Sequence, residues 1–309
     1  MVFLDLRDEW SLTEHLRKAA RIPPGSPVRK GIGDDCAVYR PRGSRGKSAE
    51  DLLFTCDLFG EGIHFLRTSL KAPQAGRRAL ARSLSDIAAM GGKPQFCLVA
   101  LCAAEWTDTR WIDGFYKGLL KLADETGTVL AGGDLSHGDR FICDVTVCGS
   151  VPRGKALLRS GARVGDEIYV SGLLGRCDYT RLEPRLELGV FLREKLGATA
   201  AMDLSDGLSL DLRRLCLASG VSAEIGEPPR FPGATRDAAL NGGEDYELLF
   251  TVPKGRRVPE TFRGLPLTRI GRMVRGRPGR VLLDGIALQP GGYDHFRRTH
   301  TVNLEESSL

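Results

Sequence analysis

The sequence predicts an α+β protein built from two domains. At 309 residues, the chain has the length of two domains or of one large one. Segments with helical periodicity occur in both halves, between short strand-like segments. Residues 141–151 alternate between two faces, as in an antiparallel strand with one buried face. Helices mixed with antiparallel strands favour an α+β fold over a doubly wound parallel sheet.

The first half is predicted to contain three helices with identifiable ends. The first has Ser11 as N-cap with Glu14 three positions later, and the Pro-rich segment 22–27 ends it. The second has an apolar face and ends at Gly91, and the third ends at Gly127. The predicted helices span 9–20, 76–91 and 108–126, and the predicted strands span 52–57, 96–102, 129–131 and 141–151.

We place a domain boundary near residue 151, which gives an N-terminal domain at 1–150 and a C-terminal domain at 151–309. The turn-rich residues 152–166 follow this boundary and precede a strand at 167–171. Another strand leads into the segment MDLSDG at 202–207, and a helix with one apolar face follows and ends at Gly220. A further strand is predicted at 246–252.

The distribution of charge argues against a nucleic-acid-binding protein. The net charge is +5, and much of the excess lies between Lys254 and Arg280, where eight arginines and one lysine face a single glutamate. These arginines lie among Gly and Pro without helical periodicity or an aromatic stacking set. That pattern favours a solvated basic surface over a nucleic-acid site.

The predicted location is the cytoplasm. No apolar run reaches 18 residues, so no membrane span is predicted, and the acidic N-terminal segment does not fit a secretory signal. The eight cysteines are scattered and form no CxxC pair. This spacing argues against a zinc site and is typical of reduced, buried cysteines in a cytosolic protein.

Acidic residues stand inside short runs of Gly and apolar residues at six places. If several of them converge, two carboxylates about 4 Å apart repel by about 4 kcal/mol at an effective dielectric constant of about 20. Bound cations would remove that conflict, and Mg²⁺ takes such oxygen ligands, usually beside substrate phosphates. The alternative is that Asp34, Asp86 and Asp134 are plain turn or cap residues. The six runs are GIGDDCAV, LLFTCDLFGEGIHF, LSDIAAMGG, LAGGDLSHGD, AMDLSDGL and GGEDYELLF.

Segments that resemble other phosphate-binding or catalytic motifs lack the residues or the neighbouring elements that those motifs require. Residues 149–156 have the GxxxxGK spacing, but Ala156 replaces the hydroxyl residue and no helix is predicted to follow. Residues 43–48 end correctly, but Pro41 stands where the motif needs Gly. No GxGxxG follows a strand, and the five histidines accompany no nucleophile elbow.

Taken in order, the motifs resemble bacterial thiamine-monophosphate kinase, in the superfamily of aminoimidazole ribonucleotide synthetase and selenophosphate synthetase. The resemblance rests on GIGDDCAV, TCDLFGEGIHF, ALARSLSDIAAMGG, AGGD, LSDGLSLDL, GGEDYELLFT and GGYDHF, and it runs from about residue 30 to 296. It implies a PurM-like architecture, with an N-terminal α+β domain that dimerises through its strands and a C-terminal α/β domain that closes the cleft. The implied reaction is in-line phosphoryl transfer from ATP to thiamine monophosphate, giving thiamine diphosphate.

The resemblance also implies roles for individual residues. Phosphoryl transfer needs positioning and neutralised charge more than covalent help, which fits Mg²⁺ held by carboxylates. The implied metal ligands are Asp34, Asp57, Asp86, Asp134 and Asp206, of which Asp86, Asp134 and Asp206 are also assigned as catalytic. The implied nucleotide-side residues are Gly31, Gly33, Thr55, Gly132, Gly133 and Ser205. The implied substrate-side residues are His64, Glu244, Asp245 and Tyr293, the last offering an aromatic face to the thiamine rings.

Several of these residues have structural alternatives. For Asp35, the alternative is that it only makes a local hydrogen bond. For Asp203, a role in the site and a structural role in the sheet are equally favoured. His64 is favoured as a packed residue over a metal ligand, because no second ligand stands at helical spacing. For Tyr293, the alternative to substrate binding is that its ring packs into the hydrophobic core near the C-terminal end.

The sequence departs from the family pattern at three places, so it does not decide which molecule accepts the phosphoryl group. Leu135 and His137 stand where the family has Thr and Arg after GGD, which removes a hydroxyl and a fixed cation. Ser83 replaces the usual Asn, and a helix of the C-terminal domain is expected to be missing after residue 175. The alternatives are therefore a related ATP-dependent enzyme with a different acceptor, or a nucleotide-binding dimer without turnover. Selenophosphate synthetase is disfavoured, because the first cysteine is Cys36.

Overall fold

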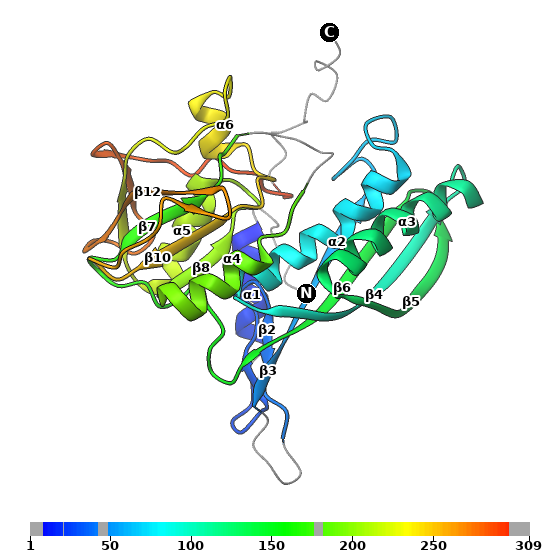
Figure 1. The fold of residues 1–309 in the computed structure, drawn as a ribbon, viewed down its shortest axis with the longest axis horizontal. Helices are drawn as coiled ribbons and strands as arrows, with labels where there is room; N and C mark the ends of the chain where they lie inside the picture. Colours follow the sequence, from blue (N-terminus) through cyan, green and yellow to red (C-terminus); the bar gives the residue numbers. More distant parts are fainter. Residues whose placement is uncertain (1–8, 21, 43–48, 176–181, 297–309) are drawn as a thin grey trace, which may run out of the picture.

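The computed structural model describes residues 9–20, 22–42, 49–175 and 182–296. Two β-sheets, each with its own helices, make up the molecule (Figure 1). The first sheet uses strands from the first half of the chain and the second uses strands from the second half. Both halves mix helices with mainly antiparallel strands, which confirms the predicted α+β class.

The first sheet has six strands in the order β1-β2-β3-β6-β4-β5. The central strand β6 pairs antiparallel with both β3 and β4, as its alternating pattern predicts, and its residues at 143, 145 and 147 are fully buried. β5 pairs only with β4, in parallel, and forms one edge of the sheet. The strands are β1 (Val28–Lys30), β2 (Ala37–Tyr39), β3 (Glu50–Gly60), β4 (Lys93–Ala104), β5 (Val129–Gly138) and β6 (Ile142–Pro152).

Helices α2 (Ala72–Ala89) and α3 (Thr109–Thr126) cover one face of this sheet (Figure 1). The ends of α3 follow local signals, since Asp108 accepts a hydrogen bond from the Trp111 N–H at 2.7 Å and Gly127 adopts a left-handed φ of 68°. The two helices pack closely because of Gly118, where a Cβ atom would lie 1.8 Å from the Pro73 carbonyl oxygen. Helix α2 also contacts the second sheet through β8, so it connects the two halves.

The second sheet follows the order β14-β13-β9-β12-β7-β10-β8, with β11 paired to β12. Helix α5 lies between β8 and β9 in the chain and packs against both. Two clusters of buried apolar side chains hold this half together, and one of them reaches Ala88 and Ala89 of α2. The strands are β7 (Glu167–Ser171), β8 (Ala200–Asp203), β9 (Ser222–Ile225), β10 (Leu248–Val252), β11 (Thr261–Phe262), β12 (Leu265–Val274), β13 (Val281–Leu283) and β14 (Ile286–Ala287). The helices are α4 (Leu186–Phe191), a π-helical turn (Leu192–Leu196), α5 (Leu208–Ser219) and α6 (Arg236–Asn241).

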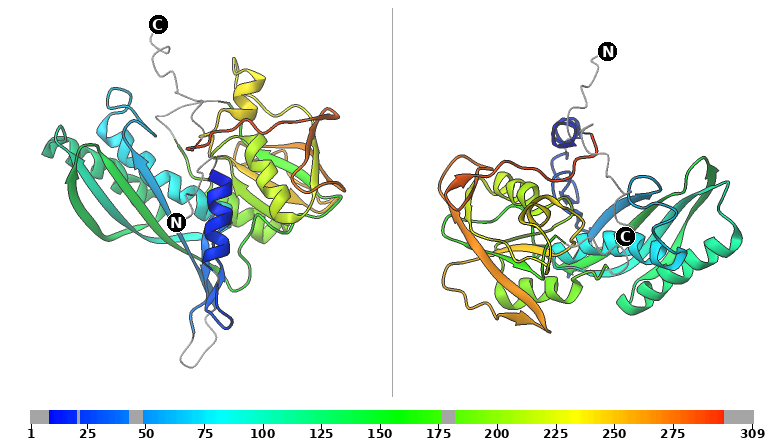
Figure 2. Two further views of the ribbon diagram at one scale, coloured as in Figure 1. Left: turned by 180° about the vertical axis from the view of Figure 1, so that it is seen from behind. Right: turned by 90° about the horizontal axis from the view of Figure 1, so that it is seen from above.

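The first helix, α1 (Glu9–Ala19), lies apart from both sheets and crosses the junction between the two halves (Figure 2). It begins at Glu9, so Ser11 lies inside the helix and the prediction that it is the N-cap is wrong. No side chain of α1 is buried. Among the described residues, no helix has the length and apolar character needed to cross a bilayer.

Candidate active site

A cavity of about 850 Å³ opens between the two sheets, beneath α1. Its wall is formed by α1, the loop before β2, β3 and the turn after it, α2, and the loops that follow β8 and α6. The cavity brings together most of the side chains that the sequence predicts to be functional. Those on its wall are Gly33, Asp34, Thr55, Asp57, His64, Asp86, Ser205, Asp206, Glu244 and Tyr293.

Helix α2 places three charged residues toward this region. Arg78, Arg82 and Asp86 are spaced four residues apart, so they lie on one face of the helix. Arg82 and Asp86 line the cavity, and Arg78 binds the Glu244 carboxylate at 2.8 Å. The opposite face of α2 is apolar and faces the sheet, where Ser83 donates a hydrogen bond to the Val145 carbonyl at 2.8 Å. The packing of α2 therefore fixes the direction of its charged face.

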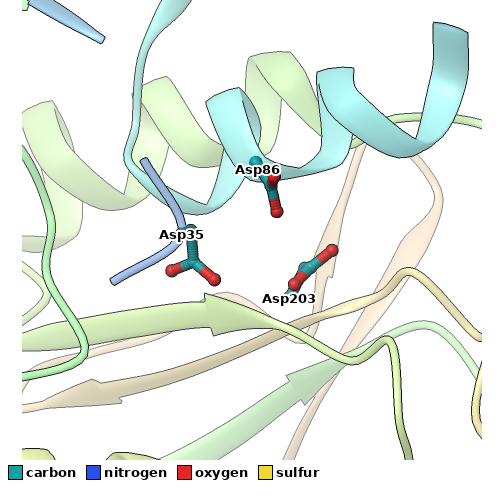
Figure 3. A group of neighbouring side chains, drawn as sticks. All are labelled: Asp35, Asp86 and Asp203. Carbon is teal, nitrogen blue, oxygen red and sulfur yellow. The ribbon is translucent and has the colours of Figure 1, made fainter. Parts of the chain in front are cut away.

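Three carboxylates converge at the end of the cavity nearest α2. Asp35, Asp86 and Asp203 each offer an oxygen atom, and these oxygens lie within 4.8 Å of one another (Figure 3). They come from the loop before β2, from α2 and from the end of β8, so both sheets contribute. Asp86 also accepts a hydrogen bond from the Thr55 hydroxyl, and Asp203 accepts one from Ser85 at 2.7 Å.

Burial sets the protonation of these carboxylates. It raises the pKa of Asp86 well above the usual range, and the charges of Asp57, Asp203 and Asp35 raise it further. Burial, followed by the charge of Asp35, does the same to the pKa of Asp203. Burial also raises the pKa of Asp35, although Arg159 acts against it. Without a cation, burial and mutual repulsion therefore favour the protonated forms of these carboxyls, whereas a divalent metal would favour the ionised forms.

The loop at 31–35 is held by basic residues on both sides. Lys30 binds the Asp34 carboxylate at 2.9 Å, and the backbone N–H of Arg159 donates to Asp34 at 2.9 Å. The Arg159 guanidinium binds Asp35 at 2.6 Å. Gly33 allows the turn with a φ of 111°. Asp34 is thus an anchor for the loop, while Asp35 points one of its oxygens at the carboxylate group.

The loop after β8 is organised by a buried carboxylate in α5. Asp211 accepts hydrogen bonds from the backbone N–H groups of Asp206 at 3.0 Å and Gly207 at 3.1 Å. Arg214 binds both Asp206 and Asp211, the latter at 3.1 Å. Gly207 has a φ of 113°, which the chain needs to enter α5. These contacts turn Asp206 toward the cavity.

The segment 242–246 forms the opposite wall, and its backbone is unusual. Glu244 and Tyr246 have φ values of 57° and 50°, which residues other than Gly adopt rarely and which cluster at functional sites. Hydrogen bonds from their N–H groups to the carbonyls of Ser205 at 2.6 Å and Leu204 at 2.8 Å hold this conformation. The two loops are therefore a single unit that presents Ser205, Asp206 and Glu244 together.

His64 and Tyr293 lie on the aromatic side of the cavity. The Gly60 N–H donates to His64 Nδ1 at 3.1 Å, so the ring proton lies on Nε2, which is buried without a hydrogen-bond partner. Burial lowers the pKa of His64 to about 2, so the ring is neutral. Tyr293 contacts His295 edge to face, with ring centroids 4.7 Å apart, and His295 contacts His64 in turn.

Five predicted residues lie outside the cavity wall. Asp134, Gly132 and Gly133 belong to the edge strand β5 and are exposed, and a Cβ atom at Gly133 would lie 1.9 Å from the Val99 carbonyl oxygen. Gly31 packs against Ile22. Asp245 accepts a hydrogen bond from the Gly175 N–H at 2.9 Å and so supports the turn after β7. Gly133 and Asp245 therefore have structural reasons for their identity, and the roles assigned to these five residues remain predictions.

Two carboxylates and several basic residues at the site were not predicted as functional. The sequence does not decide between structural and functional roles for Asp35 and Asp203, yet they form the carboxylate group with Asp86. The spacing of Arg78, Arg82 and Asp86 on one helix face was a usable signal for the α2 arginines. Arg159 carries no comparable signal, because its partner Asp35 lies 124 residues away in the chain. Arg214 stands three residues after Asp211 on α5, a helical spacing that is a usable signal.

Comparison with known proteins is consistent with this geometry. Residues 33–151 match the family described as AIR synthase related protein, N-terminal domain. Thiamine-monophosphate kinase from Rhodopirellula baltica is 36% identical over 293 residues, covering 88% of this chain and 90% of the relative. Thiamine-monophosphate kinase from Bacillus subtilis is 33% identical over 319 residues, covering 88% and 95%.

Solved structures agree along nearly the whole chain. A structure of AaThiL complexed with AMPPCP and TMP has a TM-score of 0.82 and 30% sequence identity, covering 96% of this chain and 99% of the other. Thiamine-monophosphate kinase from Stenotrophomonas maltophilia K279a has a TM-score of 0.72 and 34% identity, covering 91% and 98%. With this extent of identity and coverage, the chain belongs to the thiamine-monophosphate kinase family.

Proposed function

We propose that this protein transfers a phosphoryl group from ATP to thiamine monophosphate, giving ADP and thiamine diphosphate. The observation that carries the proposal is the cavity between the sheets, where buried carboxylates from both halves face basic and aromatic residues. The relatives named for this activity and the related structure with AMPPCP and TMP support the same substrates. Two polyanionic substrates need a site that neutralises charge and fixes position, and this cavity offers both.

The residues present fit Mg²⁺. Hard oxygen ligands are what Mg²⁺ prefers, and Asp35, Asp86 and Asp203 supply them within 4.8 Å of one another. One oxygen of Asp35 and one of Asp57 are buried without a hydrogen-bond partner, which a cation would correct. We propose that these residues and Asp206 hold the metal. When bound, Mg²⁺ would offset the negative charge on the phosphates of the nucleotide.

The chain's own residues then position the two substrates. Arg214 fixes Asp206, and Asp211 fixes the backbone of the same loop, so the carboxylate needs no rearrangement. His64 is neutral, with a proton on Nε2, and can donate a hydrogen bond on the aromatic side of the cavity. Tyr293 offers an aromatic face to the thiamine rings. Direct in-line transfer requires only that these groups align donor and acceptor.

The test is an assay of purified protein with ATP, MgCl₂ and thiamine monophosphate, following ADP and thiamine diphosphate together. The proposal expects equal amounts of both products and none when Mg²⁺ is chelated. ADP without thiamine diphosphate would indicate another acceptor. ATP binding without either product would support the non-catalytic alternative.

We propose in addition that the protein is a homodimer formed through the six-stranded sheet. The face of this sheet opposite α2 and α3 carries exposed apolar side chains, which are Phe54, Leu58, Phe96 and Leu98. Leu135 on the edge strand is 73% exposed. A second copy would cover these side chains. Asp134 lies on the same edge strand, away from the cavity of its own chain, so as a metal ligand it would act in the cavity of the second copy.

A cytoplasmic location and the absence of nucleic-acid partners are further parts of the proposal. The seven cysteines in the described part of the chain are all free. Two of the arginines in the basic stretch bind acidic neighbours, Arg269 with Glu167 and Arg272 with Glu224, each at 2.9 Å. These pairs support a solvated surface with balanced charge.

A further inference from the structure

We propose that Arg82 binds the phosphate of the acceptor and so selects phosphorylated thiamine over thiamine itself. This inference rests on the proposed function and adds a specificity-determining residue to it. Arg82 lies on α2, one turn before Asp86, and lines the cavity. It therefore stands between the carboxylate group, on the nucleotide side, and the side that holds His64, Glu244 and Tyr293.

The hydrogen bonding of Arg82 is incomplete. Its side chain is only 11% exposed, and its Nε and Nη1 atoms are buried without a hydrogen-bond partner. Unpaired donors at a buried position are uncommon in folded proteins, because leaving them unpaired costs free energy. A ligand anion is the missing partner that such a guanidinium fits, since its planar fork matches the geometry of phosphate oxygens.

The nearest carboxylate does not account for Arg82. Glu244 lies 3.5 Å from Arg82 Nη1 and makes no hydrogen bond with it. Glu244 is instead bound by Arg78, whose Nη2 donates to it at 2.8 Å. The Arg82 guanidinium also lies 5.8 Å from the centre of the Tyr246 ring, which supports it from the protein side. Its neighbours thus hold Arg82 in position, while its Nε and Nη1 donors keep no hydrogen-bond partner. A change of side-chain rotamer would turn these donors toward an anion in the cavity.

The charges around Arg82 favour this position for the acceptor phosphate. The carboxylate group would be occupied by Mg²⁺ and the nucleotide phosphates under the proposed function, so it would not compete for Arg82. The acceptor phosphate must lie next to the transferred group, and Arg82 is the cation one turn from Asp86 whose hydrogen bonding is incomplete. Among the described arginines on the cavity wall, Arg159 and Arg214 are already bound to Asp35 and Asp206.

The experiment compares the binding of two ligands that differ only in the phosphate. Calorimetric titrations with thiamine monophosphate and with thiamine are run in the presence of Mg²⁺ and a non-hydrolysable ATP analogue. They use the wild type, Arg82→Met, Arg82→Lys and the control Arg77→Met. Arg77 is also on α2, but its ion pairs with Glu125 and Glu183 lie outside the cavity.

The expected result is a selective loss. Arg82→Met should weaken the binding of thiamine monophosphate by roughly tenfold to a hundredfold, as for the loss of a charge-assisted hydrogen bond, and leave thiamine binding unchanged. Arg82→Lys should lose less, because it keeps the charge but not the fork. It also tests the inference if Arg82→Met does not fold. Arg77→Met should match the wild type for both ligands.

Two results would overturn the inference. The first is an unchanged affinity for thiamine monophosphate in the Arg82 variants. The second is an equal loss for both ligands, which would make Arg82 a structural support. Failure of the proposed function is distinguishable from either, because the wild type itself would then bind no thiamine monophosphate and form no thiamine diphosphate.

Discussion

Asp86 is the residue on which the electrostatics of the site depend most. It stands among Asp57, Asp203 and Asp35, and burial together with these charges raises its pKa well above the usual range. A folded protein keeps such a conflict at a cost to stability, which is offset if a cation binds there. Asp206 differs, because Arg214 already compensates its charge. The two residues are therefore expected to respond differently to substitution.

We expect Asp86→Asn and Asp206→Asn each to lower the turnover number by at least about a hundredfold, as for groups that stabilise charge in the transition state. Asp86→Asn should also raise the melting temperature in the absence of metal, because an amide at this position is buried without the free energy that folding spends on protonating or desolvating the carboxyl of Asp86. Asp206→Asn should not, because it leaves Arg214 with one partner fewer. Steady-state kinetics and thermal unfolding check both effects, with Asp113→Asn on the exposed side of α3 as the control. Near-normal rates in both variants would contradict the assignment.

His64 gives a pH dependence with a defined sign. Its pKa in the folded protein is about 2, because of burial and then the charge of Arg82, against an ordinary value of 6.5. Below pH 6.5 the unfolded chain gains a proton at this position that the folded chain does not, so the folded state loses stability as the pH falls. At pH 5 the loss from this group is about 2 kcal/mol.

His64→Gln should remove this loss. The difference in the free energy of unfolding between pH 7 and pH 5 is expected to be smaller in the variant by about 2 kcal/mol. Urea unfolding of wild type and variant at the two pH values measures it. Equal losses in both proteins would mean that His64 titrates normally and is not held neutral.

Individual site residues could be predicted from the sequence where a motif fixes both the position of the residue and the direction of its side chain. The roles of Asp86 and Asp206 follow from the resemblance, on the motifs ALARSLSDIAAMGG and LSDGLSLDL. Asp203 was left open because the last residue of a strand can point into either face, and only the packed sheet decides. Arg159 was missed because its partner Asp35 lies 124 residues away in the chain.

Among the elements, α2 has the largest role, since it packs against the first sheet, α3, α4 and β8. Its approach to α3 depends on two glycines. A Cβ atom at Gly76 would lie 1.8 Å from the Phe115 carbonyl oxygen, and one at Gly118 would lie 1.8 Å from the Pro73 carbonyl oxygen. Because both obstacles are backbone atoms, the helices would have to separate to make room. Separation would also move Arg82 and Asp86.

Gly118→Ala is therefore expected to destabilise the protein although alanine favours helices. Overpacking of this kind costs about 1–3 kcal/mol and occasionally more. The free energy of unfolding from urea titration checks it, with Lys117→Ala on the exposed side of α3 as a matched control. A variant as stable as the wild type would show that the helices are not in close contact.

The same elements show why some predictions succeeded. Helix α3 was predicted within one residue of its observed bounds, because Asp108 and Gly127 are local capping signals. The place of β5 at the sheet edge could not be predicted, since strand order depends on contacts between distant segments. For that reason Asp134 was grouped with residues that line the cavity, whereas it lies on an exposed edge.

For the whole molecule, the main feature is that neither sheet makes the site alone. Asp35, Asp57 and Asp86 belong to the first half of the chain, and Asp203 and Asp206 belong to the second. The resemblance in motif order predicted this convergence, but the geometry of the carboxylate group came from the packing of α2 against β8. The uncovered face of the first sheet suggests a second level of assembly.

A charged residue on that face is expected to prevent dimerisation. Leu58 lies on β3 and is 47% exposed. Leu58→Glu should convert a dimer to a monomer, because each copy would bury a glutamate in the interface without a compensating charge. Light scattering coupled to size-exclusion chromatography measures the mass, with Leu120→Glu on α3 as the control. A wild-type protein that is already monomeric would contradict the proposed dimer.

We propose that carboxylates from both halves of the chain form one metal site for phosphoryl transfer. A crystal structure grown with Mn²⁺ in place of Mg²⁺ and with a non-hydrolysable ATP analogue tests it most directly, because the anomalous signal locates the metal without reference to the coordinates of the protein. We predict anomalous peaks within coordination distance, about 2.0–2.3 Å, of Asp35, Asp86 or Asp203 oxygens, with the nucleotide phosphates beside them. Peaks confined to other sites, or a nucleotide bound away from these carboxylates, would contradict the account.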